Sequence, residues 1–217
     1  MQSSAAKPSR LARQLAAGCK PALLICECQP ALVSPGVALV EPLARKVAAH
    51  GILPRIARLA AGFRAADVPV IHCGIAIDPH APPTIASRLQ AAMARHLPLR
   101  VTDPTSYFHP TVAPLAGDRI LMRSDGLLPF DDALLALIRA EAIDVLVLCG
   151  VSTDLALPCT AVLAVQHGLS VVVAADCVAG TVGDGLDGVL AALATIADSG
   201  TILGASTLHA KEDIASK

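Results

Sequence analysis

CGVSTDLAL, residues 149–157, joins an apolar run that is typical of a buried strand to the start of a helical pattern. In open α/β sheets, ligands bind beyond the carboxyl ends of the strands. The turn within this stretch therefore predicts both an α/β fold and the place of its functional site. Its eighth residue is Ala156, whose methyl group offers no chemistry of its own.

Further short runs of the same kind predict the rest of the sheet. They are nearly continuous in apolar residues, as expected when helices cover both faces of a sheet. The six predicted strands are residues 22–26, 69–73, 119–123, 144–149, 170–174 and 201–203. Apolar residues at helical spacing predict helices over 37–66 (two pieces or one kinked helix), 129–142, 158–167 and 186–198. This alternation predicts an open, mostly parallel six-stranded α/β sheet with helices on both faces.

The chain length of 217 residues fits one main domain. We expect this domain over residues 20–210, a polar tail over 211–217, and an extension or short helix over 1–19. The basic N-terminal segment leaves a transit peptide open as an alternative, but a short surface helix is favoured. The proline-rich segment 74–118, with a helical piece around 85–94, predicts a functional loop or lid.

Composition excludes several classes of function. Hydrophobic residues make up 54% of the chain and charged residues 16%, which predicts a folded, soluble protein. The net charge of -1 and the lack of a long basic run argue against nucleic-acid binding, and no apolar stretch is long enough to span a membrane. The seven cysteines lie mostly in apolar runs, which suits reduced thiols in the cytoplasm. A small-molecule ligand is the expected partner.

Two charged residues stand at the ends of predicted strands. Glu27 follows the first strand and Arg123 ends the third. An unpaired ion at such a position would be costly, so we expect these side chains to face each other. The residues alone leave two interpretations open, a structural ion pair and a pair with a chemical role.

Four motifs in register resemble the isochorismatase-like family, often called cysteine hydrolases. They are residues 23–29, Ala116-Gly117-Asp118, the turn 150–154 with Thr160-Ala161 after it, and residues 175–180. The resemblance runs from about residue 20 to about residue 208. It implies the open α/β fold, a hydrolase ancestry, and assembly into a homodimer or larger homo-oligomer.

The resemblance places the family's catalytic Asp, Lys and Cys at Glu27, Arg123 and Ala156. A methyl group cannot attack a carbonyl, so the usual thioester route is excluded at Ala156. Cys159 lies one turn further along the predicted helix and is interpreted as a packing thiol. The main-chain N–H groups of the turn still predict an oxyanion hole.

Other residues receive roles from their positions beside this degenerate triad. The predicted substrate-binding residues are Gln29, Val151, Ser152, Leu155 and Phe130. We expect no cofactor and no metal: Asp78-Pro79-His80 has the spacing of a metal site in nicotinamidase relatives, but it has no evident further histidine partner. His72 is interpreted as a core histidine, and Asp154 as the cap of the following helix.

Two functions follow. The first is a hydrolase of a small organic acid, amide or enol ether that works without a cysteine nucleophile. Glu27 serves as its acid or base, and Arg123 either lowers the pKa of Glu27 or grips a substrate carboxylate. The alternative is a catalytically inactive family member that serves as a ligand-binding or oligomeric scaffold.

Overall fold

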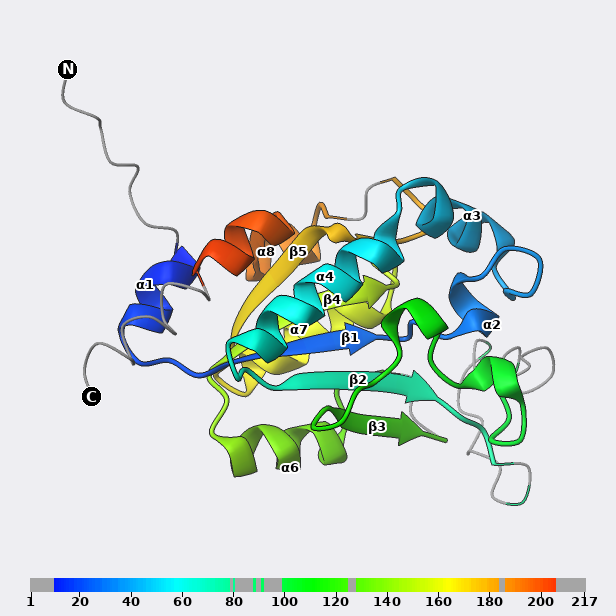
Figure 1. Ribbon diagram of the computed structural model, residues 1–217, viewed down its shortest axis with the longest axis horizontal. Helices are drawn as coiled ribbons and strands as arrows, with labels where there is room; N and C mark the ends of the chain where they lie inside the picture. The colour runs from blue at the N-terminus through cyan, green and yellow to red at the C-terminus, as the bar shows by residue number, and fades with distance from the viewer. Residues whose placement is uncertain are drawn as a thin grey trace.

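A computed structural model of the chain describes residues 10–78, 80, 88, 91, 99–124, 128–183 and 186–205. Within these residues, six strands form one sheet in the order β3-β2-β1-β4-β5-β6. All neighbouring strands are parallel, which confirms the predicted fold class (Figure 1). The strands are β1 Pro21–Cys26, β2 Val70–Ile75, β3 Arg119–Arg123, β4 Val145–Val151, β5 Ser170–Ala179 and β6 Thr195–Ala197.

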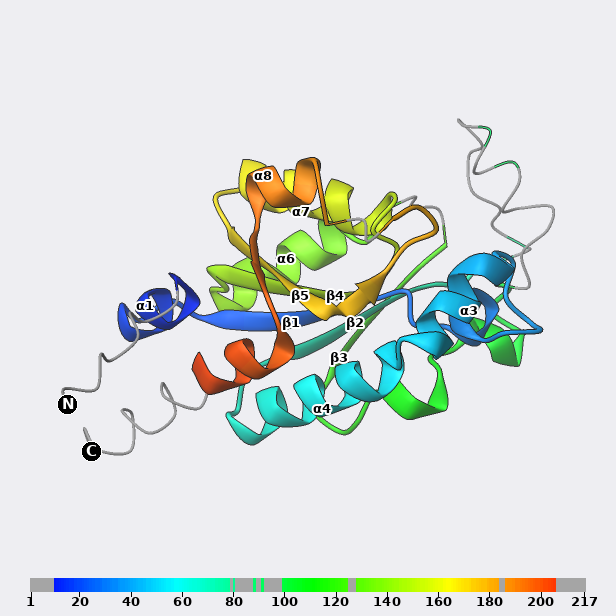
Figure 2. The same ribbon diagram turned by 90° about the horizontal axis from the view of Figure 1, so that it is seen from above.

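Helices cover both faces of the sheet (Figure 2). One side carries α3 Glu41–Ala49 and α4 Ile52–Ala65, and the other carries α6 Asp132–Glu141, α7 Ala156–Gln166 and α8 Val189–Leu193. Successive residues of β1 alternate between two buried clusters. Leu23 and Ile25 pack on the α4 side, whereas Leu24 and Cys26 pack on the α6 and α7 side. The central strand is therefore apolar at every position.

The predicted helical region 37–66 forms two helices, α3 and α4, which confirms the two-piece arrangement and not the single kinked helix. The break lies at Gly51, which has a φ of 59° in the left-handed region. Pro54 does not interrupt α4, because it is the third residue of that helix, where no intrahelical partner for its N–H group exists. The loop before this pair contains the short helix α2 Pro30–Val33.

The sixth strand lies where a helix was predicted. Residues 201–203 belong to a helical segment over 199–205, while β6 occupies Thr195–Ala197 within the predicted helix 186–198. Asp198 explains the exchange. Its carboxylate accepts hydrogen bonds from the N–H and the hydroxyl of Thr201, both at 2.8 Å, and this pattern starts a helix directly after β6.

The N-terminal segment contributes to the core as well as to the surface. Helix α1 spans Arg10–Ala16, and its residues Leu11 and Leu15 are buried in the cluster on the α4 side. Gln14 donates a hydrogen bond to the hydroxyl of Ser170 at 2.6 Å. Residues 1–9, the predicted tail 211–217 and most of the predicted helical piece 85–94 lie outside the described residues.

The described helices are all too short or too polar to cross a membrane. All seven cysteines lie in the described ranges, and each has a free thiol. Burial raises the pKa of the Cys73 thiol to about 12 and that of Cys149 well above its usual value. Both thiols are therefore inert at neutral pH.

Replacing Gly150 with alanine is expected to cost more stability than the same change at Gly168. Their φ values are 101° and 84°, so alanine is strained at either position by about 1–2 kcal/mol. A Cβ at position 150 would also collide with the carbonyl oxygen of Cys26, whereas a Cβ at 168 would meet no atom within 4 Å. Urea denaturation should show an extra loss of about 1–3 kcal/mol for Gly150→Ala. Equal losses would contradict this close contact of β4 with β1.

Candidate active site

Glu27 stands directly after β1 in an uncommon backbone conformation. Its φ of 54° lies in the left-handed region, which glutamate rarely adopts and which is often found at functional sites. The N–H of Glu27 donates to the carbonyl of Cys73 at 2.8 Å, and its own carbonyl accepts from the N–H of Gln29 at 2.8 Å. These bonds fix the backbone turn, and the residue is only 9% exposed.

Arg123 reaches Glu27 from two strands away. It ends β3, and its guanidinium passes over β2, where Nη1 donates to the carbonyl of Gly74 at 3.4 Å. Nη2 donates to Oε1 of Glu27, so the predicted ion pair is confirmed. The side chain of Arg123 is 3% exposed. This burial makes Arg123 a partner of Glu27 and leaves it little surface for a substrate carboxylate.

Gly74 makes room for the side chains that cross β2. A Cβ at this position would lie 2.8 Å from Sδ of Met122 and 3.2 Å from Cδ of Gln29. Both distances are shorter than ordinary van der Waals contact. The glycine is therefore needed where Met122 and Gln29 converge beside the ion pair.

Burial dominates the titration of Glu27. It raises the pKa of this carboxyl above its ordinary value, and the charge and hydrogen bond of Arg123 oppose that rise without cancelling it. Arg123 thus lowers the pKa of Glu27, as predicted, but burial has the larger effect and the pKa stays above its ordinary value. The site contains a carboxyl group that exchanges its proton at a higher pH than a surface glutamate does.

The turn after β4 is held by three contacts, none of which uses the side chain at position 156. Gly150 lies against the backbone of Cys26. The N–H of Thr153 donates to the carbonyl of Ala179 on β5 at 3.0 Å. Asp154 accepts hydrogen bonds from the N–H and hydroxyl of Thr181 at 2.7 and 3.0 Å. The prediction that Asp154 caps the following helix is wrong, because its carboxylate binds the loop after β5.

Helix α7 starts at Ala156, with Leu155 as its N-cap residue. The first N–H groups of a helix have no partners within that helix. The N–H of Leu157 donates to the carbonyl of Ser152 at 3.1 Å. Among the described residues, the N–H groups of Leu155 and Ala156 donate to no backbone carbonyl. The Val151–Ser152 peptide bond is cis.

Two of the predicted substrate-binding residues, Gln29 and Val151, have side chains with other roles. Gln29 is fully buried, and its amide binds the backbone of Ile75 on β2 and the carbonyl of Ser106. The side chain of Val151 is buried in the core cluster on the α4 side. These are structural positions, so the substrate-binding prediction is wrong for both side chains. Ser152 and Leu155 are half-buried beside Ala156 and stay candidates.

Phe130 lies away from the turn. Its ring stacks on His167 with a centroid distance of 5.6 Å and an interplanar angle of 12°. His167 ends α7, eleven residues after Ala156, which corresponds to a rise of about 16 Å. The prediction that Phe130 binds substrate is therefore wrong, because its ring points toward the opposite end of that helix.

The segment predicted as a lid is anchored to the end of β1. The N–H of His109 donates to the carbonyl of Cys28 at 2.8 Å. Gln29 joins Ser106 to Ile75, as described above. The 3₁₀ helices η1 Pro104–Ser106 and η2 Pro110–Val112 therefore pack beside the strand end that carries Glu27.

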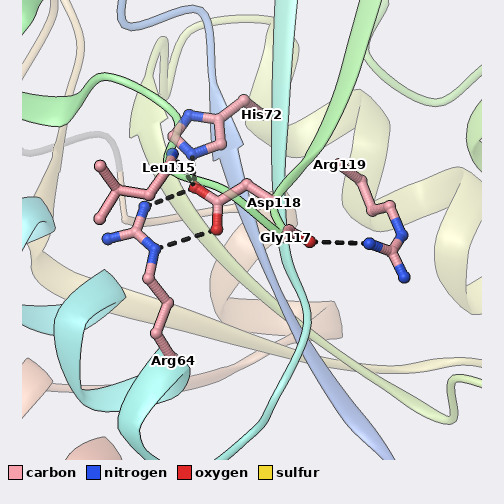
Figure 3. Close-up of polar contacts among 6 residues, drawn as sticks. All are labelled: Arg64, His72, Leu115, Gly117, Asp118 and Arg119. Carbon is pink, nitrogen blue, oxygen red and sulfur yellow. Dashed lines mark hydrogen bonds and ion pairs between the residues drawn. The ribbon is translucent and has the colours of Figure 1, made fainter.

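His72 belongs to a separate polar cluster on the α4 side of the sheet (Figure 3). It is fully buried, as the interpretation as a core histidine requires, and its Nε2 lies 3.0 Å from Oδ2 of Asp118. Arg64 donates to both oxygens of Asp118, at 2.9 and 2.6 Å. Burial lowers the pKa of His72, and the hydrogen bond to Asp118 only partly opposes this effect. A neutral histidine therefore joins β2 to α4 and β3.

The sequence did not predict the structural role of Asp118, which binds Arg64 and His72, although its motif contributed to the family resemblance. Burial alone would raise the pKa of Asp118, but hydrogen bonds from Arg64, Leu115 and His72 together hold the pKa of this carboxyl below its usual value. The preceding Gly117 also accepts a bond from Arg119 at 2.7 Å (Figure 3). A short acid-containing motif before a strand is the signal that indicates such a structural anchor.

Asp78 and His80, from the sequence motif considered for a metal site, are joined by a hydrogen bond. Oδ1 of Asp78 accepts a hydrogen bond from the N–H of His80 at 2.8 Å. Pro79 lies outside the described residues. Among the residues that are described, no group of three or more potential metal ligands comes together.

Cys159 is half-buried on α7, one turn from Ala156. The packing role predicted for its thiol therefore holds only in part. The first helical position has no thiol in this chain, and Ala156 itself is 3% exposed.

The family follows from comparison with known proteins. The isochorismatase domain family matches residues 21–204. The chain belongs to the isochorismatase family. It is 32% identical over 165 residues to maleamate amidohydrolase from Pseudomonas putida, covering 74% of this chain and 73% of that relative. The family prediction is thereby confirmed, and the protein is an isochorismatase-family hydrolase by descent.

Solved structures share the fold of this isochorismatase-family protein. A cysteine hydrolase from Pseudomonas syringae pv. phaseolicola matches with a TM-score of 0.76 and 18% identity, covering 93% of this chain and 96% of the other. N-carbamoylsarcosine amidase from Thermoplasma acidophilum matches with a TM-score of 0.66 and 23% identity, covering 83% and 96%. At these identities the likeness concerns the fold.

Arg123→Met is expected to destabilise the protein in a pH-dependent way. Both influences that lower the pKa of Glu27 come from Arg123, so its removal raises that pKa further. Folding raises the pKa of this carboxyl, so ionising it costs more free energy in the folded state than in the unfolded state. The free energy of unfolding therefore falls as the pH increases from the ordinary pKa of 4.5 through the raised pKa. At pH 8 we expect a loss of about 3–5 kcal/mol, and at pH 5 a smaller loss.

Denaturant unfolding at the two pH values measures this difference. The double variant Glu27→Gln/Arg123→Met is the matched control, because it lacks the ionisable carboxyl and should show the same loss at both pH values. A loss for Arg123→Met that does not change between pH 5 and pH 8 would contradict the burial of an ionised Glu27.

Proposed function

We propose that the protein hydrolyses a small amide, enol ether or related organic acid without a cysteine nucleophile. The observation that carries this proposal is Glu27, a buried carboxyl with a raised pKa that Arg123 orients beside a turn with unused N–H donors. The relative from Pseudomonas putida is an amidohydrolase by name, which favours an amide among the three substrate classes. Glu27 is the catalytic residue, and Arg123 is a positioning residue.

In amide hydrolysis, Glu27 acts first as a base. Its carboxylate takes a proton from water while the water oxygen bonds to the amide carbon, and the carbonyl electrons move to oxygen. The N–H groups of Leu155 and Ala156 stabilise this oxyanion. When the carbon–nitrogen bond breaks, the protonated Glu27 returns its proton to the leaving amine. The products are a carboxylic acid and an amine, and Glu27 is restored.

The raised pKa of Glu27 suits both of these proton transfers. A general base or acid works best when its pKa lies near the working pH. For an enol ether, the same carboxyl would begin protonated and donate its proton to the substrate. The two substrate classes therefore require opposite starting states of Glu27.

Glu27→Gln is expected to reduce hydrolysis by about 10²–10⁴-fold, because the amide cannot exchange a proton with water or substrate. The assay uses a panel of small amides and enol ethers of carboxylic acids. Glu41→Gln is the control, since Glu41 lies in an i,i+4 ion pair with Arg45 on α3. A panel activity that Glu27→Gln leaves intact would overturn the mechanism.

The pH profile separates the two roles of Glu27. If the residue is a base, activity falls as the pH decreases through its raised pKa, with a midpoint above 4.5. If it is an acid, activity falls as the pH increases through the same value. We expect the first profile on amides. A profile whose midpoint lies at or below 4.5 would contradict the raised pKa of Glu27.

Ala156→Cys is expected to increase amide hydrolysis, because the turn keeps the backbone donors that a thiolate mechanism uses. A thiol at this position adds to the carbonyl carbon and expels the amine, and water then hydrolyses the thioester. Val162→Cys places a thiol on the exposed face of the same helix and should leave the rate unchanged. An equal gain in both variants would indicate unspecific thiol chemistry. No gain at 156 would show that the donors are misplaced.

The alternative is an inactive scaffold, and the absence of a thiol at Ala156 favours it. Helix α7 has no charged residue, and Val162 and Val165 on it are 43% and 38% exposed, which suits contact with a second copy. A panel without hydrolysis, together with ligand-induced stabilisation that Glu27→Gln removes, would support this alternative over the enzyme.

A further inference from the structure

A cavity lies on the α4 side of the sheet, beside the strand that neighbours the turn of the candidate active site. It has a volume of about 460 Å³ and lies between the α3–α4 turn and the carboxyl-terminal part of β5. We call it the α3–β5 cavity. Its lining includes Lys46, His50, Ile52, Arg55, Asp176 and Ala179. Its size falls within the range of small-molecule sites.

The charge of the α3–β5 cavity is positive. Lys46 and Arg55 are both half-buried at its wall, and His50 adds a third basic side chain. Among the described residues, neither cation makes an ion pair. Lys46 donates to the carbonyl of Gly183, and Arg55 donates to the carbonyl of Asp176 at 3.3 Å. Both of these described partners are neutral carbonyl groups, which do not cancel the positive charge of either side chain.

The carboxylate of Asp176, which lines the cavity, accepts hydrogen bonds from Ser199. Oδ1 of Asp176 accepts from the N–H of Ser199 and Oδ2 accepts from its hydroxyl, both at 2.7 Å. These bonds hold Asp176 against the helical segment 199–205. The cavity therefore combines two cations with one carboxylate whose oxygens accept hydrogen bonds from the neutral groups of Ser199.

We propose that the α3–β5 cavity binds a small organic anion that carries a carboxylate or a phosphate group. Charge-assisted hydrogen bonds from Lys46 and Arg55 recognise its oxygens, and the aliphatic side chain of Ile52 contacts its carbon part. This site is independent of the proposed hydrolysis. It adjoins the turn of the candidate active site through β5, because Val178 and Ala179 pair with Gly150 and Val151, and the carbonyl of Ala179 accepts from the N–H of Thr153.

Isothermal titration calorimetry with inorganic phosphate and with succinate tests the proposal, with sodium chloride at equal ionic strength as the reference. We expect saturable binding of at least one probe. Arg55→Gln and Lys46→Gln should each weaken it by about tenfold or more, and the double variant should abolish it. Arg58→Gln is the matched control, because Arg58 is an exposed cation on the same helix outside the cavity.

The two probes distinguish between the possible ligand classes. Binding of phosphate alone assigns the site to phosphorylated compounds, and binding of succinate alone assigns it to carboxylates. Absence of binding for both probes overturns the proposal, as does binding that the double variant retains. Glu27→Gln should bind the probe as the natural chain does, so a failure of the proposed hydrolysis would leave this result unchanged. Thermal unfolding of each variant verifies that it is folded.

Discussion

The buried ion pair between Glu27 and Arg123 links the fold to the chemistry. Neither charge is tolerable alone at its depth, because an unpaired ion in the interior costs several kcal/mol. The pair forms only if β1, β2 and β3 end at the same level, with Gly74 leaving space between them. The register of three strands is therefore tied to one contact. A shift of β3 along β2 would leave Glu27 without its partner.

Two acids with buried side chains that each contact an arginine have pKa values shifted in opposite directions by their environments. Asp118 receives hydrogen bonds from Arg64, Leu115 and His72, and these donors hold the pKa of its carboxyl below the usual value despite burial. Glu27 receives its ion-pair hydrogen bond from Arg123, and burial raises its pKa. The first acid is fixed in one charge state and serves structure. The second is able to change its charge state, which is what proton transfer requires.

The sequence predicted the ends of β1 and β3 and the Glu27–Arg123 pair, because an apolar run that stops at a charge leaves few places for that charge. It did not predict the directions of side chains beyond those ends. Phe130 follows β3 closely in sequence, yet its ring lies against His167. Gln29 is polar and near Glu27, yet its amide group is bonded to the backbone N–H and carbonyl of Ile75 on β2. The predicted strand 201–203 and the predicted helix 186–198 were misassigned because short apolar segments fit both strand and helix patterns. The helix after β6 starts where the carboxylate of Asp198 accepts from the N–H of Thr201.

The turn at residues 150–156 keeps its shape without any contribution from the side chain at position 156. Its shape depends on Gly150 against Cys26, on the Thr153 to Ala179 hydrogen bond, and on Asp154 holding the loop after β5. None of these contacts involves the side chain at 156, so an alanine there costs the turn nothing. The N–H donors at the start of α7 belong to the backbone and persist for the same reason. Stabilisation of an oxyanion and supply of a nucleophile are therefore separable in this fold. In the proposed mechanism, water accordingly supplies the nucleophile and Glu27 activates it.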